Sequence, residues 1–205
     1  MDSDAAHRRR IVLIAGHTGD GATVRAHQED PDPTVRQAAI SSLHRLGELR
    51  CKDLTCALSD PVPAVRRRAL EIIAALHGEG PAELVSVLGL LSDPDDTVVE
   101  TAAWACGELT ATPPGTVDEL IALTTGADDA LVRESAVAAL GAIGDPIALP
   151  AILAATEDKA TVRRRAVLAL APFEGPEVNE ALRRCLADRD WQVRQAAEDL
   201  WDPPH

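Results

Sequence analysis

The side chains best suited to bind a partner lie around Trp104, in the middle of the chain. Glu100 and Glu108 stand four residues to either side of it, so on a helix all three would share one face. A partly exposed tryptophan between carboxylates is a typical anchor for a protein partner. The same ring could instead fill space against a neighbouring helix, and the sequence leaves both interpretations open. The two glutamates would lie roughly 12 Å apart along a helix, too far for most carboxylate-pair chemistry.

A row of arginines recurs at a nearly constant interval and forms a second set of candidates. Each arginine directly follows a valine, and acidic residues recur with the same period. The row could bind an anion, but the shared period favours a ladder of Arg–Asp contacts between adjacent repeats. The predicted ladder residues are Arg36, Arg66, Arg133, Arg163 and Arg194. Val99 takes the arginine's place in the third repeat, so the ladder is expected to break there.

Motifs for catalysis and for cofactor binding are missing. The sequence has no GxSxG, no HExxH and no cysteine with a convincing histidine partner. Gly16 to Thr23 has the glycine spacing of a phosphate loop, but Ala22 stands where the lysine should be. None of the 4 cysteines has zinc-site spacing, and we expect them to be reduced and mostly buried. We therefore predict no catalytic residue, no cofactor and no metal.

Composition favours an all-helical protein with an acidic surface. Hydrophobic residues make up 46% of the chain and aromatic residues only 2%, so the apolar mass is small and aliphatic, which suits closely packed helices. A net charge of −13 opposes binding to nucleic acid or to an anionic membrane and favours a basic partner. With no signal peptide or membrane-length apolar run in view, we expect a cytoplasmic protein.

One sequence phrase recurs along most of the chain. An acid-rich turn, often with proline, is followed by Val-Arg, then by alanine and an aliphatic residue, as in DPDPTVRQAAISSL from Asp30. The valine of this phrase, called here the marker valine, recurs every 30 to 34 residues. The marker valines are Val35, Val65, Val98, Val132, Val162 and Val193. A weak phrase that appears six times at this period indicates a repeat architecture.

Each repeat has the signals of two helices. A longer helix begins near the marker valine, with aspartate as its N-cap and glycine at its end, as at Gly47 and Gly144. The predicted N-caps are Asp32, Asp95, Asp158 and Asp190. A shorter apolar stretch precedes the acidic turn and predicts a first helix, at residues 82–91, 117–123, 149–154 and 178–186.

The period and the acidic-turn–Val-Arg phrase resemble HEAT repeats, most closely the short bacterial type found in phycobilisome-lyase-like proteins. The resemblance implies a right-handed all-α solenoid of about six two-helix repeats whose second helices line the concave side. It covers residues 20–201, within a single domain that has a capping helix in residues 1–19 and a tail at 202–205. The repeat of about 32 residues is shorter than the usual HEAT unit.

The predicted binding surface follows from counting each marker valine as position 1. Positions three, seven and eleven then share a face that points away from the core. On the predicted concave side this face includes Arg67, Glu71, Glu100, Trp104, Glu108, Glu134 and Arg164. We expect a non-catalytic scaffold or adaptor whose partner is a protein segment, and the sequence does not fix the oligomeric state.

Two other functions stay open from resemblance alone. The repeats resemble those of HEAT-like alkylpurine DNA glycosylases, in which a tryptophan and a carboxylate hold a damaged nucleotide; Trp104 and Glu108 would take those places. The acidic charge of the chain argues against DNA binding. The likeness to phycobilisome-lyase-like proteins implies a bilin lyase or chaperone role as the other alternative.

Overall fold

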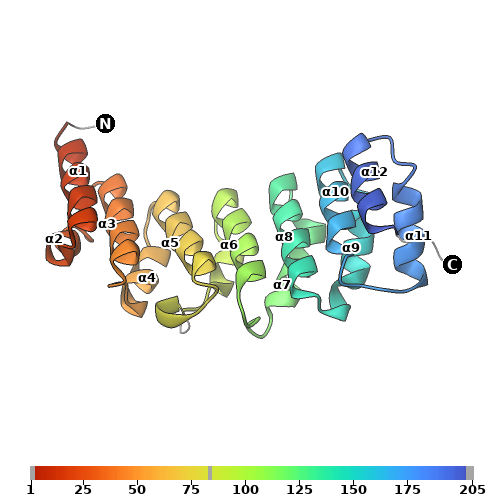
Figure 1. Cartoon of the computed structure of the whole chain (residues 1–205), viewed down its shortest axis with the longest axis horizontal. Helices are drawn as coiled ribbons and strands as arrows, with labels where there is room; N and C mark the ends of the chain where they lie inside the picture. The colour runs from red at the N-terminus through yellow and green to blue at the C-terminus, as the bar shows by residue number, and fades with distance from the viewer. Residues whose placement is uncertain (1–2, 83–84, 202–205) are drawn as a thin grey trace. The chain divides into compact units, whose positions relative to one another are not determined.

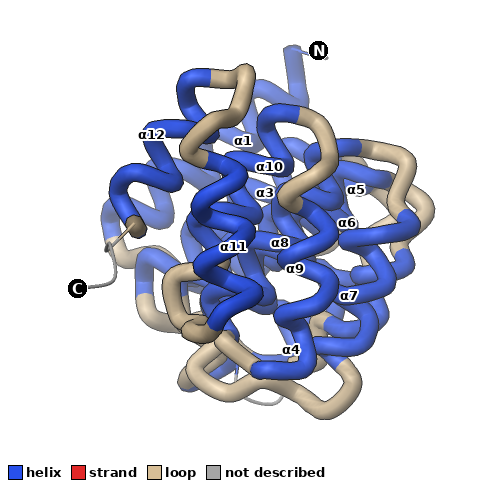
Figure 2. The backbone as a smooth tube through the Cα atoms, turned by 90° about the vertical axis from the view of Figure 1, so that its right-hand side faces the viewer, coloured by secondary structure: helices blue, strands red, loops and turns tan. Residues whose placement is uncertain are grey.

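The computed structural model describes residues 3–82 and 85–201. Its described residues form helices and loops, as Figure 2 shows, and no strand occurs among them. The helices of residues 1–90 are α1 Ser3–Thr18, α2 Gly21–Arg25, α3 Pro33–Leu46, α4 Cys51–Leu58 and α5 Pro63–Ala75. Those that follow are α6 Asp96–Glu108, α7 Thr116–Gly126, α8 Ala130–Ile143, α9 Leu149–Ala155, α10 Ala160–Ala169, α11 Pro176–Cys185 and α12 Trp191–Leu200.

The chain divides into two compact units, Met1–Leu90 and Leu91–His205. In the first unit, α1 packs on α3 and α3 packs on α5, while α2 and α4 cover this row from one side. In the second unit, α6, α8, α10 and α12 stand side by side, and α7, α9 and α11 form a second layer (Figure 1). Within each unit, neighbouring helices that contain a marker valine thus pack on each other.

Buried small and aliphatic side chains hold these helix pairs together. All six marker valines are at most 2% exposed. Ala39, Leu43, Ala136 and Leu140, which follow at helical spacing, are fully buried. The predicted all-α class and the predicted second helix of every repeat are therefore confirmed. Within the described residues, no helix is long and apolar enough to cross a membrane.

The helix ends follow the predicted signals with one exception. The side chains of Asp32, Asp95 and Asp190 accept a hydrogen bond from the backbone N–H two residues on, and each is the N-cap of its helix. The prediction was wrong for Asp158, because Lys159 is the N-cap of α10. Asp158 is instead bound by Arg133, whose guanidinium engages both carboxylate oxygens.

The first helices of the last three repeats form as predicted, as α7, α9 and α11, but the described part of the stretch 82–91 is not α-helical. Residues 83 and 84 of that stretch lie outside the described residues. Around them the chain makes two 3-10 turns, Gly80–Ala82 and Leu88–Ser92. Pro81 and Gly89 fall within these turns, and both residue types disfavour a regular helix, which explains the difference.

Glycines let neighbouring second helices approach closely. A Cβ added to Gly107 of α6 would lie 2.9 Å from the Ala139 Cα of α8, and one added to Gly141 of α8 would lie 2.6 Å from the Ala169 Cα of α10. Gly16 of α1 faces Ser42 of α3 in the same way, with a distance of 2.5 Å to the serine Cβ. Each contact joins position 10 of one helix to position 8 of the next, where His7 of α1 counts as position 1.

We expect Gly141→Ala to destabilise the second unit by about 1–3 kcal/mol, since the new methyl group would collide with the backbone of α10. Urea denaturation followed by circular dichroism measures this change. Gly126→Ala is the matched control: its Cβ would meet no atom within 4 Å, so stability should stay equal or rise slightly. Equal stability of the two variants would contradict close packing at Gly141.

Candidate functional site

The arginine after the marker valine forms a forked contact with an aspartate of the next repeat. In α3, Arg36 donates from Nε and Nη2 to the two carboxylate oxygens of Asp60, both at 2.7 Å. Two further pairs, Arg133–Asp158 and Arg163–Asp188, repeat this geometry, with distances from 2.6 to 2.9 Å. Such bidentate pairs are the strong form of the ion pair because both hydrogen bonds are charge-assisted.

The rest of each guanidinium is tied to the turn before its own helix. Nη1 donates to a backbone carbonyl oxygen five or six residues upstream, at 2.7 or 2.8 Å. The arginines that do so are Arg36, Arg66, Arg133, Arg163 and Arg194. Arg36, Arg133 and Arg163 use all three guanidinium nitrogens inside the protein, so these three act as clasps between adjacent repeats rather than as open anion sites.

The first rung of this ladder was missed from the sequence. Arg8 of α1 binds Asp30 with the same fork, at 2.7 and 3.0 Å, so α1 stands in register with the second helices. The signal was present, because Arg8 and Gly16 stand eight residues apart, like Arg133 and Gly141. It was hidden because a histidine takes the place of the marker valine.

The ladder lowers the pKa of its carboxyl groups. The hydrogen bond from Arg163 is the largest influence on the pKa of Asp188 and holds it below the ordinary value; partial burial opposes this effect but is weaker. Hydrogen bonds of the same kind raise the pKa of Arg36, Arg133 and Arg163 above its usual range. The carboxyls of Asp30 and Asp158 likewise have a lowered pKa, with the arginine as the first cause.

The predicted binding face of the second unit is accessible, and Trp104 is its most exposed part. The indole side chain is 41% exposed, while Glu100 and Glu108 on the same face of α6 are half-buried. Glu134 of α8 and Arg164 of α10 are also half-buried at the equivalent position three. Arg67 and Glu71 are half-buried on α5 of the first unit, and their place in a common surface stays a prediction.

The three side chains of each arginine triplet, 66–68 and 163–165, point in different directions. The first member turns to the ladder. The third reaches back: Arg68 Nε donates to Ser41 Oγ of α3 at 2.7 Å, and Arg165 Nη2 lies 3.5 Å from Glu134 Oε1 of α8. The middle members, Arg67 and Arg164, make no ion pair within the described residues. Each leaves positive charge at position three of its own helix, Arg67 on α5 and Arg164 on α10.

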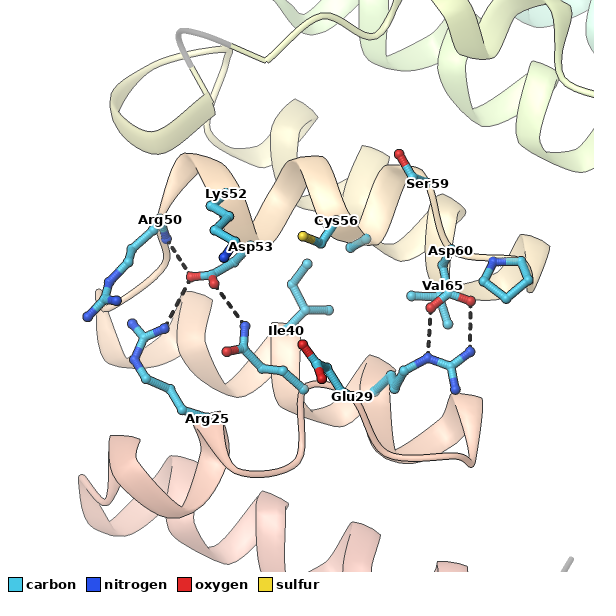
Figure 3. Close-up of a pocket in the computed structure, with 14 residues that line it drawn as sticks. Arg25, Glu29, Ile40, Arg50, Lys52, Asp53, Cys56, Ser59, Asp60 and Val65 are labelled. Atoms are coloured by element: carbon cyan, nitrogen blue, oxygen red, sulfur yellow. Dashed lines mark hydrogen bonds and ion pairs between the residues drawn. The ribbon is translucent and has the colours of Figure 1, made fainter.

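The cysteines differ more than expected. Cys106 and Cys185 are buried, and burial raises the pKa of the Cys106 thiol to about 12. Cys56 is exposed, so the prediction of mostly buried thiols was wrong for this residue. It lines a cavity of about 420 Å³ in the first unit, shown in Figure 3. Within the described residues, no group of three or more His, Cys, Asp or Glu side chains could hold a metal ion.

A sequence profile of HEAT repeats matches residues 51–141, 81–171 and 117–200, which together cover well over half of the chain. The chain belongs to the HEAT-repeat family. This confirms the resemblance inferred from the valine–arginine phrase. No curated protein matches the sequence.

Solved structures of designed repeat proteins share the HEAT-like fold. A designed armadillo repeat protein in complex with the peptide (KR)4 has a TM-score of 0.65 and 19% identity, covering 87% of this chain and 96% of that chain. An engineered protein has a TM-score of 0.63 and 20% identity, over 87% and 94% of the two chains. A second designed armadillo repeat protein has a TM-score of 0.61 and 19% identity, over 85% and 95%. At such identities the likeness shows the solenoid fold alone.

In the HEAT repeats of this chain, the ladder and the binding face use different positions of the same helix. Position two makes the clasp, whereas positions three, seven and eleven remain on the accessible face. Val99 occupies position two of α6, where it is 5% exposed, so the repeat that carries Trp104 has no arginine clasp toward α8. In this pair of repeats, α6 and α8 pack together without that clasp, and Gly107 lets them approach closely.

We expect Arg163→Lys to lower the free energy of unfolding of the second unit by about 2 kcal/mol, because an ammonium cannot make both forked bonds and also reach the Asp158 carbonyl. Arg163 and Asp188 have side chains only 7% and 14% exposed, so the loss is weakly screened. Urea denaturation measures it. Arg164→Lys, one residue on, should be neutral within about 0.5 kcal/mol. A neutral Arg163→Lys would contradict the clasp.

The ladder also predicts how stability depends on pH. Because the pKa of Asp188 is lowered in the folded state, the unfolded chain binds more protons below about pH 4. The stabilisation is therefore fully present above that pH and is lost as the pH falls through the lower folded value. Denaturation curves from pH 6 to pH 3 should show this loss. It should be smaller in Asp188→Asn, which lacks the titrating group; an unchanged acid slope would argue against the pair.

Proposed function

We propose that this HEAT-repeat protein is an interaction scaffold that binds a basic, extended segment of a partner protein. The binding site we propose is the second-helix face of the second unit, centred on Trp104. Repeat solenoids commonly work through extended binding surfaces rather than through catalysis. The observation that carries the proposal is the 41% exposure of Trp104 on a helix face that it shares with two glutamates.

The geometry suits a cationic side chain. An arginine or lysine can lie over the indole face as a cation–π contact, with a carboxylate on either side to bind the same charge or its neighbours. Four residues of helix rise by about 6 Å, so Glu100, Trp104 and Glu108 are spaced at roughly the distance between alternate side chains of an extended peptide. Glu134 adds a third carboxylate from α8, although Arg165 lies close to it.

Charge and fold both support a basic partner. The net charge of −13 attracts a cationic segment and raises its rate of encounter. The designed armadillo repeat protein with a similar fold was solved in complex with the peptide (KR)4. That peptide is therefore a reasonable first probe for this chain.

We expect a fluorescein-labelled Lys-Arg repeat of eight residues to bind, and Trp104→Ala to weaken this binding by at least about tenfold. Fluorescence anisotropy at low and at moderate salt measures both the affinity and its electrostatic part. Glu100→Gln should reduce the salt dependence, because it removes one carboxylate from the site.

Trp191→Ala is the matched control, since Trp191 is 65% exposed in the same unit but lies at the start of α12. Its affinity should equal that of the wild type. An equal loss in both variants would indicate a non-specific contribution of exposed tryptophan. Binding of duplex DNA in place of the peptide, with loss on Trp104→Ala, would favour the glycosylase-like alternative and overturn the proposal.

A further inference from the structure

The first unit contains a cavity of about 420 Å³, which is within the range of small-molecule sites. It lies between α4, the start of α3 and the turn after α2 (Figure 3). Because α2 has only five residues, a turn at residues 26–29 rather than a helix faces α4 across this space. Ile40, Ala57 and Val65 are 4%, 9% and 2% exposed and supply its apolar lining.

Two clusters of satisfied charges bound the cavity. At one end, the Asp53 carboxylate accepts hydrogen bonds from Arg25, from the Gln28 amide and from the backbone N–H of Arg50. At the other end, both oxygens of Asp60 are taken by Arg36. These ion pairs hold the walls in place, but most of their hydrogen-bonding capacity is used within the protein.

Two opposite charges in the lining are not used in this way. Lys52 extends from α4, and Glu29 comes from the turn on the facing wall (Figure 3). Both side chains are exposed, and neither makes a hydrogen bond or ion pair within the described residues. The cavity therefore presents one free ammonium group, one free carboxylate and an apolar surface beside them.

We propose that this cavity binds a small zwitterion with an aliphatic body: a free aliphatic amino acid or a short aliphatic peptide whose two termini are unmodified and charged. The ligand carboxylate meets Lys52, its ammonium meets Glu29, and its alkyl side chain covers Ile40, Ala57 and Val65. A purely anionic ligand would face the Glu29 carboxylate, and a purely cationic one would face Lys52. Only a ligand with both charges satisfies both walls. This site is independent of the peptide surface proposed around Trp104.

Cys56 provides a native reporter of occupancy. Its thiol is exposed and faces the cavity from α4, between Lys52 and Ser59 (Figure 3). The experiment measures the rate of Cys56 alkylation by iodoacetamide in the full chain, with peptide mass mapping to separate it from Cys51. Titration calorimetry gives the affinity of the same ligands. Leucine tests for a free amino acid as the ligand, and the dipeptide Ala-Leu tests for a peptide. Only the ligand that fits the cavity is expected to protect Cys56 strongly from alkylation.

Two leucine derivatives test the charges one at a time. Leucinamide lacks the carboxylate and N-acetyl-leucine lacks the ammonium, so each should bind at least about tenfold more weakly than the preferred zwitterion. Lys52→Gln should abolish the advantage of leucine over leucinamide. Glu29→Gln should abolish its advantage over N-acetyl-leucine. Protection is always compared with the unprotected rate of the same variant, so a change in thiol reactivity does not mimic binding.

The chain offers matched controls for both variants. Lys159 is its other lysine, in the second unit, and Glu79 is an exposed glutamate outside the cavity lining. Lys159→Gln and Glu79→Gln should retain the full preference for the zwitterion. Circular dichroism checks that each variant is folded. The proposal is overturned if neither leucine nor Ala-Leu protects Cys56 at about 10 mM, or if protection does not depend on Lys52 and Glu29.

Discussion

The close approach of neighbouring second helices is the constraint on which the rest of this structure depends. Aromatic residues make up only 2% of the chain, so bulky side chains cannot fill wide gaps between helices. Three pairs of these helices instead meet where a glycine faces a serine or an alanine: α1 with α3, α6 with α8 and α8 with α10. Backbones that lie this close leave no room for side-chain rearrangement, and each repeat therefore sets the position of the next. The forked arginine at the turn edge then fixes the same register by hydrogen bonds.

Packing and ladder explain why α1 belongs to the array. It contributes Gly16 at the close contact and Arg8 at the ladder, the same two devices that join α8 to α10. It therefore behaves as the second helix of a repeat and not merely as a cover. At the other end of the ladder, Arg194 donates to the Asp188 carbonyl as its counterparts do, so its guanidinium is oriented by its own turn.

The periodic features could be predicted from the sequence, and the irregular ones could not. The marker valines gave the second helices, because a buried face at helical spacing is a local signal. The role of Asp158 depended on a competing arginine 25 residues away, which no local capping rule contains. The cavity beside Cys56 depends on where α2 ends, and the 3-10 turns at Gly80–Ala82 and Leu88–Ser92 stand beside an apolar stretch that by itself predicts a helix. Exposure of Trp104 was also left open, since burial is a property of the assembled helices.

Each second helix has a more constant part, which packs and forms the ladder, and a variable part, which carries the proposed binding surface. Position one is valine in all six repeats and position two is arginine in five of them, whereas positions eight and ten are small where two second helices approach closely, as at Gly107 and Ala139. Positions three, seven and eleven change freely: they read Gln37, Ser41, Arg45 in one repeat and Glu100, Trp104, Glu108 in another. Variation there costs little stability because these side chains lie outside the close contacts. A scaffold built in this way can change what it binds without changing how its repeats stack. At these variable positions most repeats carry small, aliphatic, polar or singly charged residues, whereas the repeat of Trp104 carries a large aromatic side chain.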